Sequence, residues 1–342
     1  LVMFTALRIA VVGLGVAGSY LLRRLSDLGH EVRGFERQPL EKFKAICAWG
    51  TSRNEIKKIL QKVDFDFDDY LLHLGGSLTL DNGFRSSRIP LKGLCTYDKA
   101  RLQLELVKGL DTAYGNPPDL DYLVSKFDLV VDATGVTRAL LPRPYKDEVV
   151  PCFEYKVKYV NGRPYDDFYV KIFKSWTGYL WYFPLEGDTA YVGAGDMLSN
   201  QVREVNQFNS IHGGEIVVKQ GKAVRITPPE LSQPIVAGKV VGVGESVGTV
   251  FPMLGEGIVP SLECAELFVQ NIEDLDSYVN QVLEVYKPFA DVYRMVKLRQ
   301  AGELSLVKHM PLVVRCYRFM KEREERFGMT IRYSDLQLIL QA

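Results

Sequence analysis

The sequence predicts an α/β fold in which a mostly parallel sheet is combined with an inserted antiparallel β-sheet and a C-terminal helical region. Three observations support this prediction. Short β-branched runs recur far apart in the chain and are typical of buried parallel strands: Arg8–Val12, Glu31–Glu36, Phe127–Asp132 and Gly238–Gly244. From residue 154 to residue 226, aromatic and β-branched residues alternate with polar ones between glycine turns, as in an antiparallel sheet. From about Asp274 onward the apolar residues recur at helical spacing.

The composition is that of a globular protein, with 47% hydrophobic and 25% charged residues in a chain of 342. The 42 basic and 42 acidic residues balance, so no overall electric field attracts nucleic acid, and we expect no nucleic-acid partner. The 5 cysteines show neither CxxC nor Cys/His spacing. They predict neither a disulfide framework nor a metal site, which fits a reducing cytoplasm.

The first segment, Leu1–Val12, leads directly into a glycine turn and not into a cleavage site. We therefore expect it to form the first strand and not a signal peptide. The sequence contains no run of about 18 uncharged apolar residues, so we expect a cytoplasmic chain that does not span the membrane.

A glycine motif follows the first predicted strand, with Gly13, Gly15 and Gly18 in the pattern GxGxxG. It opens a predicted helix, whose N-terminal N–H groups can hold phosphates. Glu36 ends the second predicted strand, where an acid can accept hydrogen bonds from ribose hydroxyls, and Arg37 follows it. This arrangement predicts a dinucleotide-binding domain.

Two later segments favour FAD over NAD as the dinucleotide. Gly135 closes a predicted strand in the middle of the chain, and Glu245 follows another near residue 244. A second glycine-rich helix start lies at Pro252–Ile258. An extended FAD needs such a second helix, because its N-terminal dipole stabilises negative charge on the reduced flavin, whereas NAD does not.

The most specific motif is Tyr179-x-Trp181-x-Phe183-Pro, which is followed by Gly193-x-Gly195. With the glycine turn and the later segments, it resembles the geranylgeranyl reductase family, FAD-dependent flavoproteins of the p-hydroxybenzoate hydroxylase superfamily. The resemblance extends from about residue 7 to about residue 275. It implies a Rossmann-like (GR2-type) FAD-binding domain with an inserted antiparallel β-sheet substrate domain and a C-terminal helical region.

The resemblance also implies the site residues. By this resemblance, the residues of the glycine turn would bind the pyrophosphate, Glu36 would bind the ribose, and the CxxG segment Cys47–Gly50 would lie over the flavin face. Lys99 stands where the family has a flavin-contacting arginine, and Glu245 stands where it has the ribitol-binding aspartate. The implied cofactor-binding residues are Gly13, Gly15, Val16, Ala17, Gly18, Glu36, Arg37, Cys47, Gly50, Lys99, Gly135, Glu245, Gly257 and Ile258. The implied substrate-binding residues are Tyr179, Trp181, Phe183, Gly193 and Gly195.

We divide the chain into three parts on this basis. The discontinuous FAD-binding domain comprises residues 1–52, 88–150 and 236–275. The substrate domain comprises residues 53–87 and 151–235, and the C-terminal helical region residues 276–342.

The implied activity is reduction of isolated C=C bonds in prenyl (geranylgeranyl-type) chains of lipids or isoprenoid precursors. Hydride would come from N5 of reduced FAD, and a proton donor is then needed, for which Cys47 is the candidate because a thiol is mostly protonated at neutral pH. Two alternatives stay open: a flavin-dependent monooxygenase or halogenase of the same superfamily, and a non-catalytic flavin- or lipid-binding protein.

The partners follow from the same hypothesis. Trp176, Tyr179, Trp181, Phe183 and Tyr191 lie on neighbouring predicted strands, so we expect some of them to wall an apolar cavity for the prenyl tail and the others to belong to the strand core. The electron donor stays open among a ferredoxin-like protein, a quinol and NAD(P)H. Basic residues outnumber acidic ones between Tyr286 and Arg332, which is typical either of peripheral contact with an anionic membrane or of a solvated helix surface.

Overall fold

The six-stranded sheet carries the predicted strand–turn–helix unit near the N-terminus. The computed structural model describes residues 6–340, so residues 1–5 of the predicted first strand lie outside the described residues. Strands β16, β9, β1, β2 and β8 are parallel neighbours, and β15 pairs with β16 in the antiparallel sense. The α/β prediction is confirmed. The strands of this sheet are β1 (Arg8–Val12), β2 (Glu31–Glu36), β8 (Thr112–Tyr114), β9 (Leu129–Asp132), β15 (Val236–Ala237) and β16 (Val240–Gly242).

The second sheet has seven strands in the order β14-β10-β13-β12-β11-β5-β6. It is antiparallel as predicted, except that β11 and β5 are parallel. These two strands come from distant parts of the chain, so no hairpin imposes the antiparallel direction on them. The strands are β5 (Ser77–Asp81), β6 (Ser86–Pro90), β10 (Val149–Lys158), β11 (Phe168–Ile172), β12 (Gly178–Pro184), β13 (Thr189–Asp196) and β14 (Glu215–Arg225).

A small third sheet, which the sequence did not predict, lies between the two larger ones. It consists of β3 (Gly50–Ser52), β7 (Leu94–Tyr97) and β4 (Leu71–Leu74), all antiparallel. It joins the segment that follows the first βαβ unit to the second sheet, because Thr96 donates a hydrogen bond to the carbonyl oxygen of Pro184 at the end of β12. Residues 50–52 therefore lie at the junction between the two large sheets.

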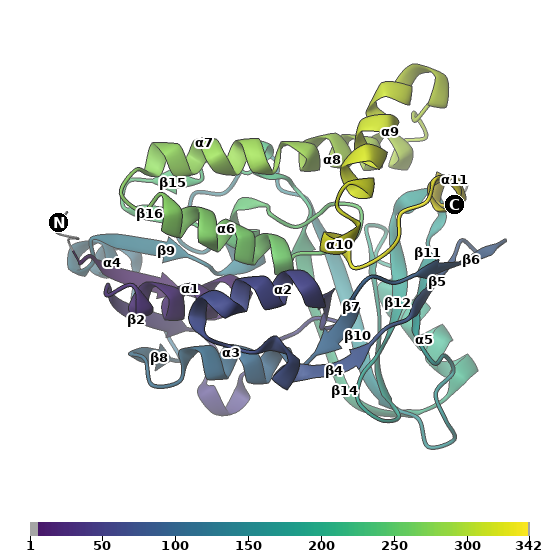
Figure 1. The fold of residues 1–342 in the computed structure, drawn as a ribbon, viewed down its shortest axis with the longest axis horizontal. Helices are drawn as coiled ribbons and strands as arrows, with labels where there is room; N and C mark the ends of the chain where they lie inside the picture. Colours follow the sequence, from purple (N-terminus) through teal and green to yellow (C-terminus); the bar gives the residue numbers. More distant parts are fainter. Residues whose placement is uncertain (1–5, 341–342) are drawn as a thin grey trace.

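The helices cover the sheets on several sides (Figure 1). In α1, Leu21, Leu22 and Leu25 are buried at the spacing that predicted this helix, and the helix ends before Gly29 at φ +87°. Helix α5 packs on β10, β12 and β13, so one face of the second sheet is covered and its other face is directed into the molecule. The helices are α1 (Val16–Asp27), α2 (Arg53–Leu60), α3 (Lys99–Val107), α4 (Leu120–Lys126), α5 (Gln201–His212), α6 (Ile258–Gln270), α7 (Leu275–Val285), α8 (Lys287–Gln300), α9 (Leu306–Lys321), α10 (Glu324–Phe327) and α11 (Tyr333–Leu340).

The C-terminal region is helical, and it returns across the molecule to the second sheet (Figure 1). Helix α11 lies beside β6, where Ser87 donates a hydrogen bond to Asp335. The indole N–H of Trp176 donates to the carbonyl oxygen of Ile339. Among residues 6–340, no helix is both long enough and apolar enough to cross a membrane. The division of the chain into three domains stays a prediction.

Candidate functional site

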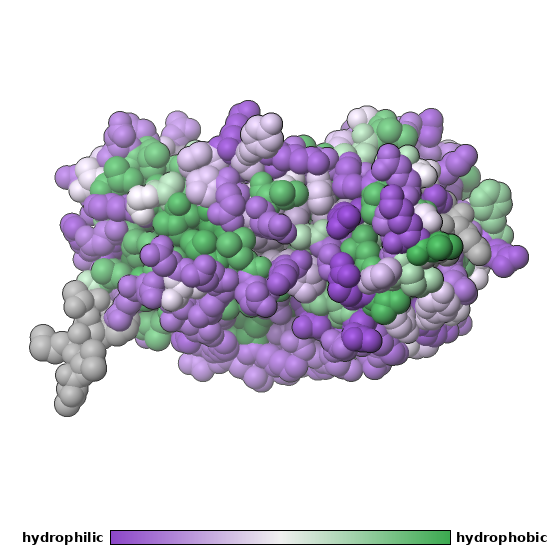
Figure 2. Space-filling model, turned by 90° about the horizontal axis from the view of Figure 1, so that it is seen from above, coloured by the Kyte–Doolittle hydropathy of each residue, from purple (hydrophilic) through white to green (hydrophobic). Residues whose placement is uncertain are grey.

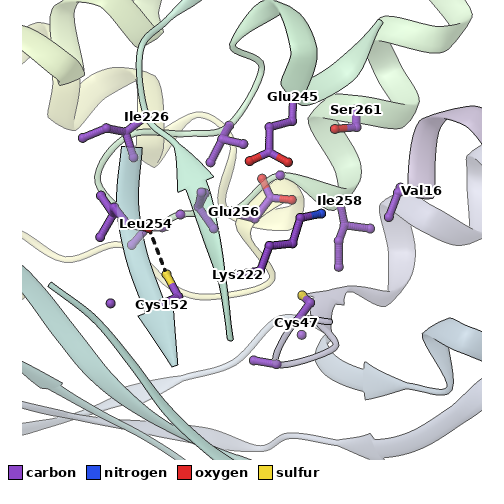
Figure 3. Close-up of a pocket in the computed structure, with 18 of the residues that line it drawn as sticks. Val16, Cys47, Cys152, Lys222, Ile226, Glu245, Leu254, Glu256, Ile258 and Ser261 are labelled. Carbon is purple, nitrogen blue, oxygen red and sulfur yellow. Dashed lines mark hydrogen bonds between the residues drawn. The ribbon is translucent and has the colours of Figure 1, made fainter. Parts of the chain in front are cut away.

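One large cavity of about 1050 Å³ lies between the two large sheets (Figure 3). Its wall is formed by the glycine turn after β1, by the inward face of the second sheet, by the start of α6 and by the C-terminal helices. Almost all of the predicted site residues line it. The exceptions are Gly18 and Gly193, which lie behind the wall.

The glycine turn has the geometry of a phosphate site. Gly13 has φ +92°, and a Cβ there would lie 2.5 Å from the carbonyl oxygen of Ala133. Gly18 fits α1 against this turn, since its Cβ would lie 1.8 Å from the Gly13 carbonyl oxygen. Gly15, by contrast, borders open space and precedes α1 without capping it by a side chain. The N–H groups of the first helical turn at Val16 and Ala17 are therefore available at the cavity wall.

Glu36 holds this turn in place from the end of β2. Its Oε2 accepts a hydrogen bond from the Leu14 N–H at 2.9 Å, and its Oε1 accepts one from the Gln38 N–H at 2.9 Å. Arg37 lines the cavity beside it. The predicted ribose-binding acid therefore borders the cavity, and its role stays a prediction.

The middle of the cavity is bounded by Gly135, Glu245 and the start of α6. A Cβ on Gly135 would lie 2.9 Å from Oε2 of Glu245, whose Oε1 accepts a hydrogen bond from the Arg225 N–H. Gly257 and Ile258 begin α6 at the cavity wall. Figure 3 shows the carboxyl groups of Glu245 and Glu256 and the ammonium group of Lys222 directed toward the same part of the cavity.

The CxxG segment lies directly against the aromatic motif of β12. A Cβ on Gly50 would lie 2.4 Å from the Phe183 ring, so the two segments are in contact because residue 50 has no side chain. Cys47 is partly exposed and lines the cavity. Lys99 is buried at the start of α3 and lines the cavity as well.

The aromatic motif forms a wall because alternate residues of a strand point to the same side. Tyr179, Trp181 and Phe183 line the cavity, whereas Leu180 and Tyr182 pack into the core under α5. Gly195 lies opposite Tyr179 in the neighbouring strand and Gly193 lies opposite Trp181. A Cβ on Gly193 would lie 2.3 Å from the Trp181 ring, so the two glycines make room for the aromatic side chains.

Trp176 also lines the cavity, as expected, but Tyr191 does not. Tyr191 is thus the one of the five that belongs to the core, and the ring of Trp49 packs on it with the ring centroids 5.1 Å apart. This packing could not be foreseen from the strand alternation alone.

Two acidic residues that the sequence analysis missed also line the cavity, Glu154 on β10 and Glu256 before α6. Burial raises the pKa of Glu154 to about 7, although its hydrogen bond from Gln220 opposes the shift. Burial also raises the pKa of Glu256 to about 7, against the opposing charge of Arg326. The available signal was a charged residue between aromatic ones in a predicted strand, and an acid inside the glycine-rich helix start.

Arg326 belongs to the segment that was considered for membrane contact, but it is buried and lines the cavity. It contributes to the cavity wall and not to a surface patch. Among residues 6–340, no group of three or more histidine, cysteine and acidic side chains is placed to hold a metal ion.

The fold is that of flavin-dependent reductases, halogenases and monooxygenases whose structures have been solved. A geranylgeranyl bacteriochlorophyll reductase-like protein from Thermoplasma acidophilum superposes with a TM-score of 0.70 at 16% identity, covering 98% of this chain and 96% of that one. CmlS, a flavin-dependent halogenase, gives 0.67 at 18% identity over 98% of this chain and 76% of its own. PqsL, a probable FAD-dependent monooxygenase from Pseudomonas aeruginosa, gives 0.61 at 14% identity over 87% and 99%.

These likenesses confirm the predicted fold. A curated protein described as uncharacterized, MJ1182 from Methanocaldococcus jannaschii, is 24% identical over 83% of this chain and 87% of its own length. The chain matches no protein-family model.

Proposed function

We propose that the chain is an FAD-dependent oxidoreductase that reduces isolated C=C bonds of prenyl chains in lipids or isoprenoid precursors. The observation that carries this proposal is the continuity of the cavity. One continuous cavity extends from the phosphate-type turn at Gly13 and Gly15 to the aromatic wall of β12. It can hold an extended cofactor and an apolar substrate beside each other.

The residues present fit FAD. Gly15 borders open space at the start of α1, and the start of α6 at Gly257 and Ile258 reaches the same cavity beside it. Two helix N-termini directed at one cavity suit a cofactor with phosphates at one end and a ring that gains negative charge at the other. When bound there, FAD would supply the hydride for the reaction.

The part of the cavity beyond Trp181 suits a prenyl chain. Its wall is formed by apolar side chains of the second sheet and of the C-terminal segment, namely Leu78, Leu80, Ile89, Val170, Phe183, Met329, Ile331, Leu336 and Ile339. An isoprenoid tail has no hydrogen-bonding groups, so apolar area and shape must hold it.

The chain's own residues would orient the substrate and exclude water around the reacting bond. Phe183 and Trp181 line the cavity, and so does Cys47, three residues before Gly50, whose backbone is in contact with the Phe183 ring. An unpolarised alkene accepts hydride when a proton reaches its other carbon, so a proton donor is required here. The thiol of Cys47 is one candidate for that donor.

We also propose that α9 touches an anionic membrane surface. Val307, Met310 and Val314 are exposed on this helix, with Lys308 and Arg318 exposed among them. Figure 2, which views the molecule from the side of α7, α8 and α9, shows hydrophobic patches among mostly hydrophilic residues. Apolar side chains framed by cations complement an anionic lipid surface. Tyr317 and Met320 of the same helix line the cavity, which would place the membrane near its substrate.

Sedimentation with vesicles tests this contact. We expect binding to vesicles of phosphatidylglycerol and phosphatidylcholine but not to vesicles of phosphatidylcholine alone, and weaker binding for Val307→Asp combined with Val314→Asp. Equal binding of this double variant and the unmodified protein would show that α9 is merely solvated.

The reaction is tested by anaerobic photoreduction of the purified holoprotein and mixing with a geranylgeranyl lipid. We expect flavin reoxidation without oxygen and a product heavier by two hydrogens for each bond reduced. Reoxidation that requires oxygen and yields an oxygenated or halogenated product would establish the monooxygenase or halogenase alternative. Stable reduced flavin under all conditions would leave a non-catalytic flavin- or lipid-binding protein. Reducing the flavin with NAD(P)H, a ferredoxin or a quinol in separate reactions identifies the electron donor.

A further inference from the structure

A row of residues that crosses the second sheet places Glu154 beside the aromatic wall. Strand pairing sets Gln220 opposite Glu154, Glu154 opposite Gly193, and Gly193 opposite Trp181. Side chains in such a row point to the same side of a sheet. Since Trp181 lines the cavity, Glu154 is directed to the cavity face, and it lines the cavity too.

The missing side chain of Gly193 brings Glu154 and Trp181 together. A Cβ on Gly193 would lie 2.3 Å from Cζ2 and 2.5 Å from Cε2 of Trp181, and 2.6 Å from Cβ of Glu154. Cε2 is bonded to the indole nitrogen, so the edge of the Trp181 ring that carries the N–H lies at residue 193, next to Glu154. Glu154 is 2% exposed, and its Oε1 accepts one hydrogen bond, from Gln220 Nε2 at 2.7 Å.

The second oxygen of this carboxyl group is not satisfied by the protein. Among the described residues, neither Oε2 of Glu154 nor the N–H of Trp181 has a partner within the distance and angle limits of a hydrogen bond, although the N–H groups of Trp181 and Cys47 lie close enough to oppose the rise of the Glu154 pKa. An ionised carboxylate with one hydrogen bond in a buried place is costly, whereas a carboxylic acid has one O–H to donate and fits such a place better. Glu154 itself borders the cavity in which a substrate would lie.

The charged and titratable groups around Glu154 come from several elements. Lys99 lies at the start of α3, Cys47 lies before β3, Cys152 lies on β10, and Tyr191 lies on β13. Burial raises the pKa of Glu154 to about 7, while Gln220, Lys99, Trp181 and the backbone N–H of Cys47 limit the rise. The acid therefore changes its charge near neutral pH, as a general acid should.

We propose that Glu154 is the proton donor of this cavity. This inference rests on the proposed function. Glu154 gives its proton to one alkene carbon, and the electron pair of the π bond becomes the new C–H bond. The other alkene carbon forms its C–H bond with a hydride, which brings its own electron pair. The alkene is reduced and the reduced flavin, as the hydride source, is oxidised. Gln220, the Trp181 N–H and the charge of Lys99 stabilise the carboxylate left on Glu154, and water returns the proton.

Infrared difference spectra of the oxidised holoprotein against pH test the protonated acid without any turnover. We expect a carboxylic-acid band that disappears with an apparent pKa of about 7 in the unmodified protein. Glu256 titrates in the same range, so the comparison with Glu154→Gln isolates the band of Glu154. A Glu154→Gln spectrum identical to that of the unmodified protein would overturn the proposal.

Single-turnover reoxidation by a geranylgeranyl lipid tests the transfer itself. We expect Glu154→Gln to slow this step by about 10² to 10⁴ fold, with unchanged photoreduction and flavin content, and Glu154→Asp to be intermediate. Glu266→Gln is the matched control, because it removes a buried carboxyl group that does not line the cavity, and it should keep the rate of the unmodified protein.

Two outcomes would contradict the assignment. If Glu154→Gln keeps the rate of the unmodified protein while Cys47→Ala loses it, the thiol supplies the proton. If the unmodified protein itself is not reoxidised by prenyl lipid, the proposed function fails and the donor role fails with it. The infrared test is independent of turnover. A protein that shows the Glu154 band but is not reoxidised has the protonated acid without the proposed activity, whereas a protein without the band lacks the protonated acid.

Discussion

Glu266 and Glu154 are both buried, but they lie in very different surroundings. Glu266 lies between α1 and α6, where the Tyr20 hydroxyl, Arg24 and Lys62 reach it at 2.5, 3.2 and 2.6 Å. Glu154 has a single hydrogen bond on the cavity face of the second sheet. Burial alone would raise the pKa of Glu266, but the hydrogen bonds from Lys62 and Tyr20 keep it below its usual value.

The difference shows that burial does not decide the charge state of an acid by itself. Where the fold supplies several donors and cations, a carboxylate is stable and binds elements together. Where the fold places few donors or cations near a buried acid, the acid keeps its proton up to a higher pH and can act as a proton donor. The core between α1 and α6 shows the first case, and the cavity wall shows the second.

Removal of the structural acid has the largest expected effect. Glu266→Ala leaves Tyr20, Arg24 and Lys62 without their shared acceptor, and we expect it to lower the free energy of unfolding by about 3 kcal/mol. This is the low end for a buried ion pair, because Arg24 and Lys62 are partly exposed. Urea unfolding measures it, with Glu154→Gln as the matched change in the cavity. A larger loss for Glu154→Gln at pH 7 would contradict the comparison.

The contributions of Glu154 and Glu266 to the free energy of unfolding should also change with pH in opposite directions. The folded-state pKa of Glu154 is raised from 4.5 to about 7, so its contribution is complete below 4.5 and is lost as the pH rises through about 7. Relative to Glu154→Gln, the unmodified protein should lose roughly 1.4 kcal/mol for each pH unit in that window. Glu266 has a lowered pKa, so its contribution is present above 4.5 and is lost in acid. Urea midpoints from pH 4 to pH 8 measure both, and parallel curves would refute the difference.

Gly193→Ala changes the contact on which the environment of Glu154 depends. The added Cβ would press on Trp181 and on Cβ of Glu154, and we expect a loss of about 1–3 kcal/mol in stability. Tryptophan fluorescence and the infrared band of Glu154 should change with it. Gly76→Ala is the control, because its Cβ would meet Asp167 at an ordinary 3.6 Å. Equal effects of the two substitutions would show that Trp181 does not lean on residue 193.

The smallest expected effect on stability belongs to an exposed acid, Asp291. Asp291 pairs with Arg315 at 2.8 Å, but both side chains are substantially exposed to solvent. We expect Arg315→Ala to change the free energy of unfolding by less than about 1 kcal/mol, and by less still at 0.5 M salt. Thermal unfolding at two salt concentrations is sufficient. A loss as large as that for Glu266→Ala would mean that solvent screening does not separate these cases.

The parts of the site that follow from local patterns could be predicted from the sequence. The Gly13-x-Gly15 turn is fixed by its own strand and helix, and the alternation of β12 places Tyr179 and Trp181 on one side whatever the rest of the fold does. The spacing of Gly193 and Gly195 also follows the period of a strand. Antiparallel pairing then sets these glycines opposite the aromatic residues.

The parts that depend on distant pairing could not be predicted. The environment of Glu154 is set by the register of β10 against both β13 and β14, which no local pattern contains. Tyr191 is packed against Trp49 from another segment, and Arg326 is buried next to Gly328, whose carbonyl oxygen accepts hydrogen bonds from the N–H groups of Lys92 and Leu94. In each case, a side chain's exposure is decided by a neighbour far away in the sequence.

The cavity wall is completed late in the chain. Its first residue is Val12, and Leu336 and Ile339 of α11 still belong to it. A ribosome delivers these residues more than three hundred positions apart, so a nascent chain can form the glycine turn long before the apolar end is closed. A ligand that spans the cavity can therefore be bound in full only late in biosynthesis. Shortening α11 would weaken the binding of such a ligand at its apolar end and leave the glycine turn unchanged.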